Sequence, residues 1–150
     1  MSTAKLILLV EDNLDDEELT LRALRKAEVP NQVVVARDGA EAVDILFDKD
    51  LHPQVVLLDL NLPKLDGHEV LRRIRAHEAT RHLPVVVLTS SKEDIDITRS
   101  YQLGANSYVR KPVDFKQFIE TLNTLSTYWL SMNHSPLEAS DAVVDSTLRR

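Results

Sequence analysis

Five short apolar runs divide the chain, and a segment with helical spacing follows each of them. The runs are residues 6–10, 33–36, 55–58, 85–88 and 108–109. The first, third and fourth are continuously apolar rather than alternating, which is typical of strands that are buried on both faces of a parallel sheet. We therefore predict five strands in a parallel sheet.

Apolar side chains recur three or four positions apart in the segments that follow the runs, which predicts amphipathic helices. The expected helices are residues 14–27, 40–47, 68–76, 94–103 and 114–132. Acidic residues fill the first turns of the first helix, where they oppose the positive end of the helix dipole. The regular alternation of strand and helix predicts an α/β fold in which helices cover both faces of the sheet.

The length and composition narrow the class of protein. The chain has 150 residues, which fits one domain; we place it at residues 5–132, followed by a mixed polar tail at 133–150 that we expect to be flexible. The absence of cysteine excludes disulfides, thiolate metal sites and a cysteine nucleophile. A net charge of −6 disfavours nucleic acid as a partner. No apolar run reaches the roughly 20 residues of a membrane helix, and the start has no signal-peptide layout, so we expect a cytoplasmic protein with no membrane partner.

Reactive polar side chains follow four of the five predicted strands. Glu11 and Asp12 follow the first strand, and Asp59 follows the third. Thr89 ends the fourth strand, and Lys111 comes just after the fifth. Ligands of open α/β sheets bind outside the carboxyl ends of the strands, so this edge is the candidate site.

The chemistry of these groups favours phosphoryl transfer. Three carboxylates at one edge repel one another, which raises a pKa or requires a cation, and oxygen ligands without His or Cys favour Mg²⁺ or a similar ion. A carboxylate such as that of Asp59 can act as a nucleophile toward phosphorus. The Lys111 ammonium and the Thr89 hydroxyl would supply the alignment and charge neutralisation that this reaction needs.

Each of these residues also has an ordinary structural explanation. An acidic pair after a strand usually caps a helix, and Thr89 alone would also be read as a cap. Lys111 alone would be a solvated charge, and Tyr108 alone would be a packing residue. It is their joint arrangement, each at a strand end, that favours the functional interpretation.

Over roughly residues 5–130 the chain resembles the receiver domain of two-component response regulators. The matching motifs are Val10-Glu11-Asp12-Asn13, Leu57-Leu58-Asp59-Leu60-Asn61-Leu62-Pro63, Leu65-Asp66-Gly67, Leu88-Thr89-Ser90 and Val109-Arg110-Lys111-Pro112. The resemblance implies a flavodoxin-like, doubly wound, five-stranded parallel sheet in the order 2-1-3-4-5, with five helices and an extended last helix.

The resemblance also implies a role for each acidic residue. Asp59 would be the phosphoacceptor. Asp12 would ligate Mg²⁺ (or Mn²⁺) directly and Glu11 mainly through water. Asn61 would ligate the ion through its backbone carbonyl.

Four further residues would form the phosphoryl-binding and switch set. Thr89 would bond a phosphoryl oxygen, and Lys111 would pair with the phosphoryl group. Tyr108 would swing inward when Thr89 moves. The bond from Lys111 to Pro112 would be cis, as the family suggests.

A narrower resemblance is to single-domain regulators paired with bacterial and cyanobacterial phytochrome histidine kinases. It is carried by Glu11-Asp12-Asn13 followed by Asp15-Asp16, by residues 59–64, and by Tyr128-Trp129-Leu130. This subgroup implies homodimers through the face of helix 4, strand 5 and helix 5. The stripe Tyr128, Trp129 and Leu130 is either core or a dimer or docking surface.

Two other functions compete with a phosphorylated signalling switch. An aspartyl-nucleophile phosphatase of the haloacid-dehalogenase type also places a nucleophilic Asp after a strand, but its acid/base Asp would fall at Asn61, which cannot cycle a proton. A transcription regulator would need a DNA-binding domain, and residues 133–150 are too few to form one. We therefore expect a switch that is not an enzyme acting on a separate substrate and that signals through its own surface.

Overall fold

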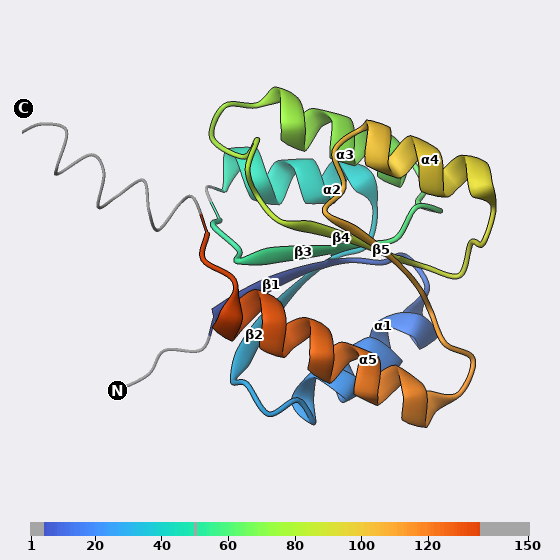
Figure 1. Cartoon of the computed structure of the whole chain (residues 1–150). Coiled ribbons are helices and arrows are strands. Elements are labelled where there is room, and N and C mark those ends of the chain that lie inside the picture. Colours follow the sequence, from blue (N-terminus) through green and yellow to red (C-terminus); the bar gives the residue numbers. More distant parts are fainter. Residues whose placement is uncertain (1–4, 50, 136–150) are drawn as a thin grey trace, which may run out of the picture.

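The predicted parallel sheet is present in the computed structural model, which describes residues 5–49 and 51–135. The strands are β1 (Lys5–Val10), β2 (Asn31–Ala36), β3 (Val55–Leu58), β4 (Val85–Thr89) and β5 (Ser107–Arg110). All pairings are parallel and the strand order is β2-β1-β3-β4-β5 (Figure 1). The fold class and strand order expected from the sequence are therefore confirmed. Most of the predicted tail, residues 136–150, lies outside the described residues.

Helices cover both faces of this sheet. They are α1 (Leu14–Arg25), α2 (Gly39–Val43), α3 (Gly67–Ala76), α4 (Asp94–Gln102) and α5 (Phe115–Thr127). Figure 1 shows α1 and α5 together on one face, and α2, α3 and α4 on the other. Two π-helical turns, Asp44–Asp48 and Tyr128–Met132, prolong α2 and α5. The long helix predicted at the end is thus an α-helix that finishes in a wider turn.

The continuously apolar strands supply a core to each face. In β1, Leu8 and Val10 point to the core beneath α2 and α3, whereas Ile7 and Leu9 point to the core beneath α1 and α5. Every residue of β3 and β4 is buried. Full burial of such a side chain contributes roughly 1.5–3 kcal/mol, so the sheet is the rigid base on which the loops at its carboxyl edge rest.

The helix caps lie beside the reactive residues rather than on them. The Asn13 side chain caps α1 by accepting a hydrogen bond from the Asp16 N–H at 2.9 Å. Asp38 and Asp66 cap α2 and α3 in the same way. Glu11 and Asp12 therefore do not cap α1, and the structural explanation considered for them does not hold.

The apolar stripe at the end of the chain is divided between core and surface. Leu130 is only 1% exposed and belongs to the core beneath α1 and α5, so of the two alternatives left open for this residue the structure shows the core. The reason is that Leu130 comes four residues after Ser126 and eight after Leu122, both buried, so it lies on the same buried face of the helix. Trp129 packs partly against the same core, while Tyr128 and Met132 are exposed. Within the described residues, no helix is long and apolar enough to cross a membrane.

Candidate functional site

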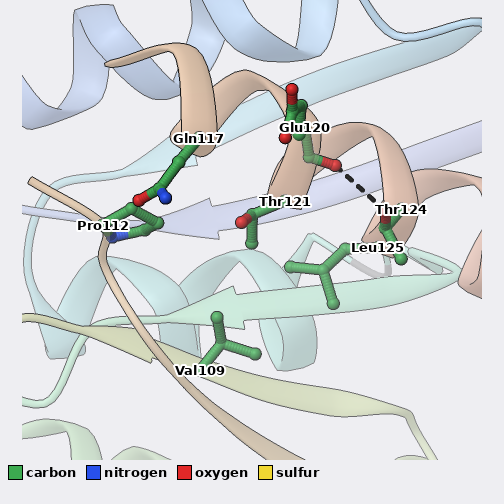
Figure 2. A pocket seen from close by; sticks show the side chains of 7 residues that line it. All are labelled: Val109, Pro112, Gln117, Glu120, Thr121, Thr124 and Leu125. Atoms are coloured by element: carbon green, nitrogen blue, oxygen red, sulfur yellow. Dashed lines mark hydrogen bonds between the residues drawn. The ribbon is translucent and has the colours of Figure 1, made fainter. Parts of the chain in front are cut away.

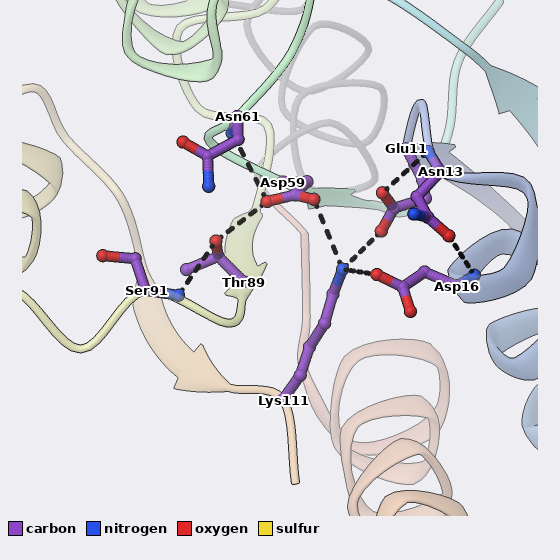
Figure 3. Close-up of polar contacts among 8 residues, drawn as sticks. All are labelled: Glu11, Asn13, Asp16, Asp59, Asn61, Thr89, Ser91 and Lys111. Atoms are coloured by element: carbon purple, nitrogen blue, oxygen red, sulfur yellow. Dashed lines mark hydrogen bonds and ion pairs between the residues drawn. The ribbon is translucent and has the colours of Figure 1, made fainter. Parts of the chain in front are cut away.

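The carboxyl ends of β1, β3, β4 and β5 bring the predicted polar residues to one place. Glu11 follows β1, Asp59 follows β3, Thr89 ends β4, and Lys111 follows β5 (Figure 3). Parallel strands end at the same edge of the sheet, so four distant parts of the sequence meet here. The cluster lies at the loops of that edge, above the two cores.

Asp59 is the centre of this cluster and is only 7% exposed. Its Oδ1 accepts a hydrogen bond from the Thr89 hydroxyl at 2.8 Å, and its Oδ2 lies 3.3 Å from the Lys111 ammonium. The backbone N–H of Asn61 donates to Oδ1 at 3.4 Å. Each carboxylate oxygen thus has a donor beside it, and these same donors could serve a phosphoryl group on Asp59.

Three carboxylates form a group that fits a divalent cation. Oxygen atoms of Glu11, Asp12 and Asp59 all lie within 4.8 Å of one another. Glu11 is buried and Asp12 is exposed, so the group opens to solvent on the Asp12 side. A donor set made only of oxygen suits a hard cation such as Mg²⁺ or Mn²⁺. Asn61, the fourth predicted ligand, lies exposed immediately beyond Asp59.

The raised pKa of Glu11 is consistent with a cation-binding site. The pKa of the Glu11 carboxyl is raised to about 7, mainly by burial and also by the charge of Asp59, although the hydrogen bond from Lys111 lowers it. A positive ion beside it would favour the charged form and remove this penalty. The residues present therefore fit the ion that the sequence predicts.

Lys111 is held by three carboxylates. Its Nζ lies 2.5 Å from Glu11 Oε1, 3.1 Å from Asp16 Oδ2 and 3.3 Å from Asp59 Oδ2 (Figure 3). Burial alone would lower the pKa of this ammonium, but the bond to Glu11 and the nearby negative charges raise it to about 12. Lys111 is therefore a permanent positive charge beside Asp59.

Asp16 was not among the predicted site residues. The sequence placed it in the first turn of a helix, where an acid has an ordinary role against the helix dipole. Only the packing of α1 beside the loop after β5 reveals that Asp16, rather than Asp15, reaches Lys111.

Gly67 also contributes to the site, although the sequence motif did not show how. A Cβ atom at Gly67 would collide with the backbone oxygen of Asp59 and come within 2.7 Å of the Leu60 Cα. Its N–H donates to the Leu60 carbonyl at 3.0 Å. The start of α3 is therefore packed directly on the backbone that carries Asp59.

The predicted switch residues are linked through Ser91. The Ser91 N–H donates to Thr89 Oγ1 at 3.4 Å, and its carbonyl accepts from the Tyr108 hydroxyl at 2.9 Å. The Ser91 hydroxyl donates to Asp96 Oδ2 at 2.6 Å, which reaches the first turn of α4. Burial raises the pKa of Tyr108. Ser91 therefore connects Thr89 to both β5 and α4 through hydrogen bonds.

The expected cis bond between Lys111 and Pro112 is wrong. No cis peptide bond occurs among the described residues, so this bond is trans. The trans isomer of an X–Pro bond is favoured by roughly 0.5–1 kcal/mol, and Lys111 reaches the acidic group in this conformation.

A groove of about 480 Å³ lies on the β5–α5 side of the molecule, next to the loop that carries Lys111. Figure 2 shows Thr121 and Leu125 of α5 pointing toward Val109 of β5. Glu120 and Gln117 form its polar rim. This groove extends from the site loop along the outer surface of α5.

Comparison with protein families finds one match over most of the chain. The family model of the response regulator receiver domain matches residues 7–123. The probable methanogenesis regulatory protein FilR2 of Methanothrix harundinacea is 44% identical over 138 residues, which cover 87% of each chain. Response regulator Rcp1 of Synechocystis is 36% identical over 131 residues, covering 84% of this chain and 89% of that protein.

Solved structures agree with these sequence matches. The phosphorylated cyanobacterial phytochrome response regulator RcpA is 40% identical, with a TM-score of 0.83 over 89% of this chain and 99% of that one. The Mn²⁺-bound form of Rcp1 is 35% identical, with a TM-score of 0.80 over 88% of this chain and 99% of that one.

Proposed function

Because this chain belongs to the family of response regulator receiver domains, we propose that it is a single-domain two-component response regulator that accepts a phosphoryl group on Asp59 from a histidine kinase in a Mg²⁺-dependent reaction. The observation that carries the proposal is the position of Asp59, between the Lys111 ammonium and the Thr89 hydroxyl and beside two further carboxylates.

The reaction would proceed by in-line transfer from phosphohistidine. An oxygen of the Asp59 carboxylate forms a bond to phosphorus as the phosphorus–nitrogen bond breaks, and the imidazole nitrogen leaves with that electron pair. Lys111 and Thr89 donate to the phosphoryl oxygens and balance the charge that accumulates on them. Glu11, Asp12, Asp59 and the Asn61 carbonyl would hold the Mg²⁺, which neutralises phosphoryl charge.

An aspartyl phosphatase remains a weaker candidate. Receiver domains are signalling switches, and no group at position 61 can supply and recover a proton, because Asn61 carries an amide. We therefore propose that turnover is limited to the chain's own phosphorylation and dephosphorylation.

The proposed phosphodonor is a phytochrome histidine kinase. RcpA is a cyanobacterial phytochrome response regulator, and this chain covers 99% of the RcpA chain. Leu19 and Val113 are exposed apolar residues that line a small pocket with Lys111, and Leu14, also exposed, begins the same helix as Leu19. We take these three residues together as one apolar patch. We propose that the kinase docks on this patch.

We further propose a homodimer through the α4–β5–α5 face and a cytoplasmic location without a nucleic-acid partner. Ile95 and Tyr101 of α4 are exposed apolar residues, and the groove between β5 and α5 is partly apolar. Aromatic and aliphatic anchors of this kind are typical of protein interfaces. The net charge of −6 argues against a nucleic-acid partner.

Phosphotransfer profiling tests the proposal. The chain is mixed at short times with each phosphorylated histidine kinase of its host, and we expect transfer from a phytochrome kinase that requires Mg²⁺. Asp59→Asn should abolish labelling, because an amide is not a nucleophile toward phosphorus. Labelling that persists at another residue would overturn the site, and preference for a different kinase would overturn the phytochrome assignment.

A further inference from the structure

The ammonium group of Lys111 has three N–H donors and three carboxylate acceptors. Two of the acceptors, Glu11 and Asp59, belong to the group whose oxygens lie within 4.8 Å of one another. Asp16 is not part of that group among the described residues. It is therefore the acceptor of Lys111 that a bound cation would not share.

Asp16 is itself held in place. Its backbone N–H bonds the Asn13 side chain at 2.9 Å, which fixes the first turn of α1. Figure 3 shows its carboxylate reaching Lys111 from the α1 side, whereas Asp59 lies on the other side of the ammonium. The Lys111 side chain is 10% exposed, so little water competes for its donors.

We propose that Asp16 is a positioning residue for phosphoryl transfer, which keeps the Lys111 ammonium directed at Asp59 while Glu11 and Asp59 are shared with a divalent cation. This rests on the proposed function and adds a residue to it. Glu11 and Asp59 would hold the ammonium less firmly when they also serve a cation, so Asp16 would decide where the ammonium stays. Preorganised charge of this kind lowers the barrier because no reorganisation is needed during the reaction.

Phosphorylation by acetyl phosphate tests this without a kinase. An Asp59 oxygen bonds phosphorus as the bond from phosphorus to the acetyl oxygen breaks, and acetate leaves with the electron pair. At saturating Mg²⁺ we expect Asp16→Asn to slow phosphorylation about tenfold, as measured by intact-protein mass. Asp16→Glu should restore part of the rate. The matched control is Asp15→Asn, which removes the same charge from an exposed neighbour in the same turn and should leave the rate unchanged.

A second measurement uses the metal-free protein. Lysine acetylation followed by peptide mass spectrometry reports how firmly Lys111 is held, with the exposed Lys116 as internal reference. We expect Lys111 to react several-fold faster in Asp16→Asn than in Asp15→Asn. A double-mutant cycle completes the test, because Asp16→Asn should have no further effect on the rate when Lys111→Ala is present.

The outcomes separate this inference from the proposed function. Equal rates and equal Lys111 labelling in Asp16→Asn and Asp15→Asn would overturn the role of Asp16 and leave the proposed function standing. An equal loss of rate in both variants would also overturn it, since that is the effect of net charge alone. A wild-type chain that is never phosphorylated on Asp59 would overturn the proposed function, while the labelling of Lys111 would still report whether Asp16 holds it.

Discussion

The buried carboxylate of Glu11 depends on its neighbours for hydrogen bonds and charge. Glu11 has almost no exposure, and its oxygens are satisfied by Lys111 and by the Asn13 N–H. Burying an unpaired carboxylate costs several kcal/mol, so the ammonium that we propose for phosphoryl transfer also stabilises the folded protein. Both pKa values are raised, that of Glu11 because the carboxyl is buried and that of Lys111 because acidic groups surround the ammonium. The proposed function and the stability are thus coupled at Glu11 and Lys111.

The hydrogen bond and the raised pKa of Tyr108 can be tested with one substitution. Tyr108→Phe removes the hydrogen bond to the Ser91 carbonyl and should lower the free energy of unfolding by about 0.5–1 kcal/mol near pH 8. Burial raises the pKa of the Tyr108 phenol, so the folded state favours the protonated form. This contribution is fully present below the ordinary tyrosine pKa and is lost as pH rises through the higher folded value. Urea titrations at increasing pH should show the two proteins converging; a constant difference would contradict the shift.

At the scale of elements, the strands and the positions of their ends were predictable, but the packing of the helices was not. Continuous apolar runs identify β1, β3 and β4, because only a strand covered on both faces needs them. The sequence also placed Asp59, Thr89 and Lys111 at the correct edge, since strand ends determine that edge. The contact of Asp16 with Lys111 and the burial of Leu130 depend on how helices pack and turn, which periodicity does not specify.

Gly67→Ala tests how the α3 start positions the site. The added methyl group would meet the backbone of Asp59 and Leu60, so either α3 or the Asp59 loop must move. We expect the free energy of unfolding to fall by about 1–3 kcal/mol, measured by urea denaturation. Phosphorylation by acetyl phosphate should slow in the folded fraction, because Asp59 shifts relative to Lys111. Normal rates with reduced stability would show that Gly67 matters for packing alone.

At the scale of the whole molecule, hydrogen bonds connect the acidic edge to the α4–β5–α5 face. Thr89 bonds both Asp59 and Ser91, and Ser91 in turn contacts Tyr108 of β5 and Asp96 of α4. A phosphoryl group that takes the Thr89 hydroxyl would remove one support of Ser91. Tyr108 and Asp96 would then be free to shift, so phosphorylation would change the surface that we propose for dimerisation.

Substitutions at two exposed apolar positions can test the proposed dimer surface and the proposed kinase-docking surface independently. Ile95 of α4 is 74% exposed on the proposed dimer face, and Leu14 of α1 is 67% exposed in the patch proposed for kinase docking. Ile95→Lys should reduce the molar mass in light scattering from dimer to monomer and leave phosphotransfer from the kinase unchanged. Leu14→Lys should slow phosphotransfer from the kinase and leave the molar mass unchanged, because it places a charge in the kinase contact and leaves α4 intact. Both side chains are largely solvated, so each variant should keep the thermal stability of the parent chain. If Leu14→Lys dissociates the dimer while Ile95→Lys does not, the two surfaces have been assigned the wrong way round, and α1 rather than α4 carries self-association.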